Sequence, residues 1–188
     1  MKNLGMHEIG ARSQLRSPWP TFDESWRGIL DIVPAIAYTC DADGLISYFS
    51  PFSETVWGRA PKLRNPSDRY CGSLRLYKPG GAPMRHDQCW MALALRDGHE
   101  YNGREVVLER PDGMRVLGLA HANPLHGDKG QTIGAVNLIL GMKVFGDALY
   151  GNGGVVLRET LPSDAVLAMI EIVISTLTAV TWSASAFA

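Results

Sequence analysis

Residues 37–50, AYTCDADGLISYFS, constrain the fold of this chain more than any other stretch. Two runs rich in β-forming residues, Ala35–Cys40 and Leu45–Ser50, flank the short acidic segment Asp41–Gly44. Gly44 can adopt the positive φ that such a turn requires, and aspartate side chains at 41 and 43 can accept hydrogen bonds from nearby amides. The stretch therefore predicts an antiparallel β-hairpin close to the beginning of the chain.

Three short helices are expected around this hairpin. Their ranges are 23–33, capped by Asp23 and stopped by Pro34; 52–57, closed by Gly58; and 88–96, capped by Asp87 and ended by Gly98. The capping residues are those that satisfy free amides at a helix start, and the glycines are those that allow a left-handed residue at its end.

Three further strands are expected in the second half of the chain, at 103–110, 114–123 and 132–140. Strands at both ends of this order must pair if they are to share a single sheet. We therefore expect an α+β fold: a five-stranded antiparallel sheet with short helices across one face, together with N- and C-terminal helical extensions. The expected organisation is an irregular arm at 1–22, a single domain at 23–142 and an extension with an apolar helix at 143–188.

Composition and charge narrow the class of protein. Hydrophobic residues make up 46% of the chain, which favours a packed core, and the net charge of -1 with no basic run argues against nucleic acid as a partner. Three irregularly spaced cysteines and the absence of an apolar leader predict a reducing, cytoplasmic setting.

The segment 166–188 is largely apolar, and its only charged residue is Glu171. A membrane span is disfavoured because this charge lies inside the run, several positions are Ser or Thr, and no basic residue flanks its end. We expect instead a helix buried against the domain or against a second chain, and the latter arrangement favours a homodimer.

Three stretches together resemble the PAS domain, a sensor and interaction module of bacterial signalling proteins. They are AIAYTCDADGLISYFSPFSETVWGRAP, DRYCGSLRLYKPGGAPMRHDQCWMALALRDGHE and RPDGMRVLGLAHANPLHGDKGQTIGAVNLIL. The resemblance covers about residues 24–142, with Ser50 where asparagine is common in the family, and the middle stretch resembles a subgroup attached to sensor histidine kinases.

The resemblance implies a curved sheet and helices that enclose a small cavity. In such modules a ligand in the cavity, or a partner on the sheet face, shifts the packing of flanking helices. No kinase histidine box and no glycine-rich ATP site follow the domain, since Gly151–Gly154 lacks a subsequent Lys-Ser/Thr. A separate histidine kinase or other signalling partner is therefore implied for the output, and no enzyme activity is expected of the chain itself.

The candidate ligand-binding residues are the polar residues of the predicted strands and the large side chains around the expected cavity. They are Trp57, Tyr70, Cys71, Met91, Leu95, His121 and Asn137. An alternating strand places a polar side chain either in the cavity or in solvent, and for His121 and Asn137 both placements stay open.

Whether the domain binds a cofactor also stays open. Cys71, His86 and Cys89 are the residue types that bind zinc or haem iron, but their spacing is poor and a fourth ligand is not evident, so no metal site is predicted. A haem-binding histidine is missing from the helix at 88–96, and RYCGSLRLY does not reproduce the cysteine motif of flavin photoreceptors. A haem or flavin sensor, or the sensor part of a kinase without its catalytic domain, is the alternative function.

Overall fold

The predicted hairpin forms as two antiparallel strands, β1 (Ile36–Asp41) and β2 (Ile46–Phe49), in the computed structural model, which describes residues 25–145 and 155–156. Gly44 has φ +77°, and Asp41 Oδ1 accepts hydrogen bonds from the amides of Asp43 and Leu45 at 3.1 and 2.9 Å. The turn therefore has the chemistry that the sequence predicts.

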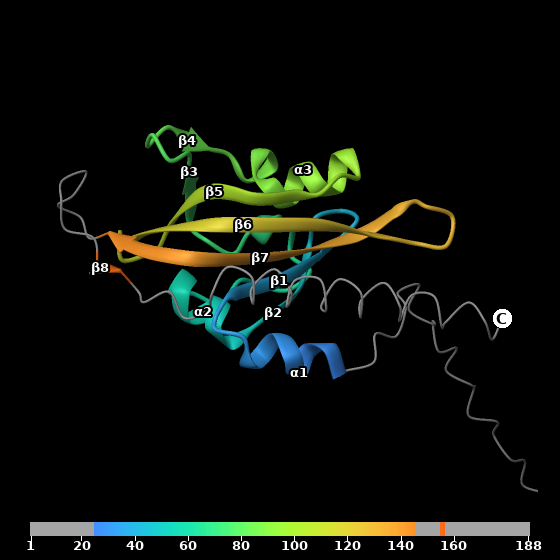
Figure 1. Ribbon diagram of the computed structural model, residues 1–188, viewed down its shortest axis with the longest axis horizontal. Helices are drawn as coiled ribbons and strands as arrows, with labels where there is room; N and C mark the ends of the chain where they lie inside the picture. The colour runs from blue at the N-terminus through green and yellow to red at the C-terminus, as the bar shows by residue number, and fades with distance from the viewer. Residues whose placement is uncertain (1–24, 146–154, 157–188) are drawn as a thin grey trace, which may run out of the picture.

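The two ends of the domain meet in one sheet (Figure 1). The long strands are β5 (Tyr101–Glu109), β6 (Arg115–His126) and β7 (Thr132–Phe145), and the strand order begins β2-β1-β7-β6-β5. β1 lies at the join, because Thr39 is opposite Tyr48 of β2 on one side and Val136 of β7 on the other. The α+β class and the five expected strands are confirmed.

The strand count is larger than predicted. β3 (Arg75–Tyr77) and β4 (Pro83–Met84) extend the sheet beyond β5, and β8 (Val155–Val156) pairs with β7, so the described sheet has eight strands. Leu76 of β3 lies opposite Leu108 of β5, which shows that β3 forms by pairing with an available strand edge. So short a strand has too little alternation to be visible in its own sequence.

The helices begin and end at short-range signals. α2 (Pro51–Trp57) is capped by the Ser50 hydroxyl and closed by Gly58 at φ +67°. α3 (Trp90–Asp97) ends at Gly98, but its predicted cap is wrong. Asp87 lies in the preceding 3₁₀ turn η2 (His86–Gln88), and its carboxylate pairs with Arg85 instead of the α3 amides.

Two apolar clusters cover the two faces of the sheet. The inner cluster joins Trp57 of α2 and Met91 of α3 to Tyr38 of β1. The outer cluster joins Leu30 of α1 (Ser25–Ile32) to Ala37 of β1 and Val136 of β7. Neighbouring residues of β1 thus face opposite clusters, as the period of a strand requires.

Several predictions concern residues whose placement is not described. They are the arm at 1–22, the Asp23 cap, and, apart from Val155–Val156 and the end of β7, the extension at 143–188 with its apolar helix. Among the helices of residues 25–145, none has both the length and the apolar character needed to cross a membrane.

Candidate functional site

Tyr38 is the centre of a buried polar cluster on the inner face of the sheet. Its side chain is 1% exposed, and its hydroxyl donates to the Tyr70 carbonyl at 3.0 Å while accepting from Asn137 Nδ2 at 3.0 Å. Burial raises the pKa of this hydroxyl well above its ordinary value, and the nearby thiols of Cys71 and Cys89 act in the same direction. The group therefore stays protonated and acts as both donor and acceptor.

Two buried polar atoms beside Tyr38 have no hydrogen-bond partner in the described part of the chain. They are Nε1 of Trp57, a donor, and Oδ1 of Asn137, an acceptor. Trp57 is fully buried and its ring meets the Tyr38 ring edge-on at 5.3 Å between centroids, while Asn137 is 3% exposed. Buried polar atoms are nearly always paired, so an unpaired donor and an unpaired acceptor beside one tyrosine mark a place suited to a small polar molecule.

Three cysteine thiols lie in the same inner cluster as Tyr38. Cys89 Sγ is 3.9 Å from the Tyr70 carbonyl oxygen, Cys71 Sγ and Ser73 Oγ share a hydrogen bond at 3.3 Å, and Cys40 lies in the same apolar cluster. Desolvation by burial raises the pKa of all three thiols, that of Cys89 to about 12. They are neutral thiols at physiological pH, and within the described residues no group of three or more His, Cys, Asp or Glu side chains is arranged to hold a metal ion.

The structure brings together most of the residues that the sequence singled out. Trp57, Cys71 and Met91 belong to the inner cluster, Tyr70 and Leu95 pack against it, and Asn137 joins it through Tyr38.

His121 lies elsewhere. It pairs with Leu138 of the outer cluster, and its Nδ1 accepts a hydrogen bond from the Gly103 amide at 3.4 Å. Desolvation lowers its pKa. The seven candidates therefore do not form one site, because His121 is on the opposite face of the sheet from Tyr38.

The residue that sequence reasoning missed is Tyr38 itself. Ile36, Tyr38 and Cys40 occupy every second position of β1 and all belong to the inner cluster. That alternation is the signal that indicates a buried tyrosine on the inner face of the sheet.

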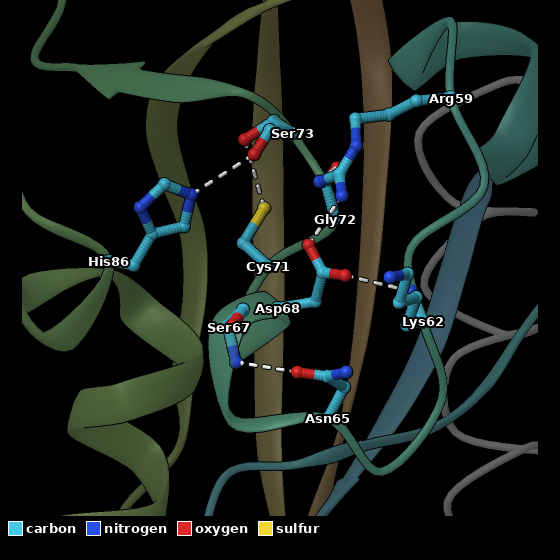
Figure 2. Close-up of polar contacts among 9 residues, drawn as sticks. All are labelled: Arg59, Lys62, Asn65, Ser67, Asp68, Cys71, Gly72, Ser73 and His86. Carbon is cyan, nitrogen blue, oxygen red and sulfur yellow. Dashed lines mark hydrogen bonds and ion pairs between the residues drawn. The ribbon is translucent and has the colours of Figure 1, made fainter.

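A cleft of about 600 Å³ lies on the outside of the segment that carries Tyr70 and Cys71. One wall runs from η1 (Pro66–Asp68) to Leu74, and the other is formed by residues 85–87. Figure 2 shows the carboxylate of Asp68 facing Arg59 and the backbone of Lys62, with Cys71 and His86 both next to Ser73. The wall that runs from η1 to Leu74 is therefore held in place by side-chain hydrogen bonds rather than by regular secondary structure.

No family model matches the chain, and no curated protein matches it. Solved structures do match. A variant of RsLOV is 12% identical, with a TM-score of 0.51, over 82% of this chain and 80% of that chain. The PAS domain of the fruit-fly ELK potassium channel is 18% identical, with a TM-score of 0.47, over 63% of this chain and 95% of that chain.

A PAS domain from Colwellia psychrerythraea is 19% identical, with a TM-score of 0.46, over 62% of this chain and 92% of that chain. At these identities the likeness concerns architecture, and it agrees with the strand order, the crossing helices and the two-faced sheet described above. The domain formed by residues 25–145 therefore has a PAS-like α+β fold, the architecture that it shares with the RsLOV variant.

Proposed function

We propose that the chain is a bacterial sensor of the PAS type, which performs no chemistry of its own and binds a small polar molecule beside Tyr38. The observation that carries this proposal is the pair of unpaired buried atoms, Trp57 Nε1 and Asn137 Oδ1, on the inner side of the sheet. A ligand that accepts from the indole or donates to the amide would regain the hydrogen bonds that burial has removed.

In this proposal, the alternation of side chains along β1 carries the signal from the ligand to α1. Tyr38 faces the inner cluster, whereas its neighbour Ala37 packs in the outer cluster with Leu30 and Val33 at the end of α1. A ligand that binds one arrangement of β1 more tightly shifts the population toward it, and the packing of α1 changes with it. The signal thus leaves on the face opposite the ligand.

We propose that the chain acts as a homodimer or on a separate histidine kinase of a two-component system. Its three cysteines are free and buried, which supports a reducing, cytoplasmic setting.

Native mass spectrometry of the full chain, taken directly from cells, tests this function. We expect a bound small molecule in the wild type and its loss in Asn137→Leu, which keeps the size of the side chain and removes the amide. Asn123→Leu is the matched control: Asn123 is equally buried, but its amide is bonded to Asn102 and the His121 carbonyl.

Equal occupancy in wild type and Asn137→Leu, or no bound molecule in the wild type, would refute the ligand assignment. An absorbance spectrum of the same sample separates a colourless ligand from haem or flavin, since each of those has a visible band.

A further inference from the structure

The lining of the cleft includes Tyr70 and Cys71 but none of the inner-face residues Tyr38, Trp57 and Asn137. Its volume of about 600 Å³ is in the range of sites for small organic molecules. Leu74, 45% exposed, and the ring of Tyr70 give it an apolar part, while arginine and aspartate side chains give it a charged part.

The charges that line the cleft do not balance. Three arginines, Arg59, Arg69 and Arg85, stand against two aspartates, Asp68 and Asp87. Asp68 is fully engaged, because one oxygen pairs with Arg59 and the other accepts from the Lys62 amide at 2.8 Å. One positive charge is left over in the cleft.

Of the three arginines that line the cleft, Arg69 is the one not paired with a carboxylate of the described residues. Within residues 25–145 its guanidinium makes one hydrogen bond, to the Asp43 carbonyl, and lies 5.1 Å from the centre of the Tyr70 ring. Its Nε is buried and has no partner in the described part of the chain. A guanidinium with five N–H donors and one hydrogen bond has donors to offer an anion.

Arg85 is paired with Asp87 in an exposed position. It meets this carboxylate through Nε and Oδ1 at 3.0 Å and through Nη2 and Oδ2 at 2.5 Å, and the two side chains are 77% and 46% exposed. Exposed ion pairs contribute little, so a ligand carboxylate can compete with Asp87 for this guanidinium.

We propose that this cleft binds a small organic carboxylate, whose negative group pairs with the arginines that line it and whose apolar body lies against Leu74 and the Tyr70 ring. The excess of a single positive charge favours a carboxylate over a doubly charged phosphate. Tyr70, which lies in one wall of the cleft, also accepts from Tyr38 through its carbonyl, so the cleft and the inner cluster share this segment of the chain.

The test is a titration of the full, ¹⁵N-labelled chain with 2-naphthoate, followed by amide chemical shifts. The uncharged 2-naphthamide is the matched probe of equal size. We expect shifts concentrated in residues 66–74 and 85–87, and binding of 2-naphthoate about tenfold tighter than of 2-naphthamide.

Charge variants give the direction of each effect. Arg69→Gln and Arg85→Gln should weaken the binding of 2-naphthoate, whereas Asp87→Asn should strengthen it by freeing Arg85. Arg104→Gln is the control, because this exposed arginine lies over the Trp90 ring outside the cleft. Arg85 and Asp87 are exposed, so their variants report on binding even if Arg69→Gln unfolds the domain.

Equal affinity for the acid and the amide, or unchanged affinity in Arg85→Gln and Asp87→Asn, would overturn the proposal. So would shifts confined to the amides around Tyr38 and Asn137, which would place the probe on the inner face. Asn137→Leu, which tests the inner site, should bind 2-naphthoate as the wild type does, so the two proposals fail separately.

Discussion

The hydroxyl of Tyr38 accepts a hydrogen bond from Asn137 Nδ2 at 3.0 Å, although 99 positions separate the two residues in the chain. They meet because β1 and β7 pair with Tyr38 directly opposite Asn137. The same hydroxyl donates to the Tyr70 carbonyl, so one buried group joins the first strand, the last long strand and the irregular wall of the cleft.

Replacing Tyr38 with Phe should lower the free energy of unfolding by about 1–3 kcal/mol, because the Tyr70 carbonyl and the Asn137 amide would lose their shared partner in a buried site. Urea denaturation measures the effect. Tyr101→Phe is the control: its hydroxyl bonds Asp97 at 2.6 Å in an exposed position and should cost less than about 0.5 kcal/mol. Similar losses in both variants would show that the hydrogen bonds of Tyr38 contribute no more to stability than an exposed one does.

Gly44→Ala should destabilise the domain by roughly 2 kcal/mol or more. Gly44 has φ +77°, and a Cβ added there would lie 2.1 Å from the Tyr70 ring, so the variant has both backbone strain and a steric clash. Gly80→Ala, with nothing within 4 Å of its added Cβ and no positive φ, is the matched control and should be close to neutral. Thermal melting compares them, and equal melting temperatures would mean that the Gly44 turn tolerates a side chain.

Glu109 should make the domain sensitive to acid. Burial alone would raise the pKa of its carboxyl, but hydrogen bonds from Tyr77, Arg115 and Arg75 hold that pKa below its ordinary value. Since the folded pKa is depressed, the stabilisation is complete above the unfolded pKa of about 4.3 and is lost as the pH falls through the folded value.

Glu109→Gln should therefore lose less stability than the wild type when urea midpoints at pH 7 and pH 3 are compared. Glu105→Gln, on the exposed part of the same strand, should behave as the wild type does. If the pH dependence of Glu109→Gln matched that of the wild type, the acid sensitivity would have another origin.

The three thiols should react slowly with an aromatic disulfide reagent at pH 8 in the native protein. All three cysteines are buried and their pKa values are raised by desolvation, so little thiolate is available for attack. In denaturing urea all three should react at once. Rapid reaction of one thiol in the native state would show that the segment around that cysteine opens readily.

Sequence reasoning predicted the parts of this fold that depend on local chemistry or on strong alternation. Asp41 and Gly44 specify a turn by themselves, and the order of the long strands leaves few ways to form one sheet. It failed at β3, where a distant partner decides, because Leu76 forms a strand by pairing with Leu108. It also failed at Asp87, which lies in the 3₁₀ turn before α3 and pairs with Arg85 two residues away.

The residues of the candidate site were likewise predictable where residue type was enough and unpredictable where strand register decides. Trp57 and Asn137 were found by residue type, but the face that each strand residue presents depends on register, and His121 belongs to the outer face for that reason. Tyr38 was missed because its role depends on a residue 99 positions away.

A crystal structure of the full chain purified from cells without added ligand tests the central claim most directly. The account predicts an organic molecule beside Tyr38, bonded to Trp57 Nε1, to Asn137 Oδ1 or to both. Water alone at these two atoms, or protein groups that pair with them, would contradict it.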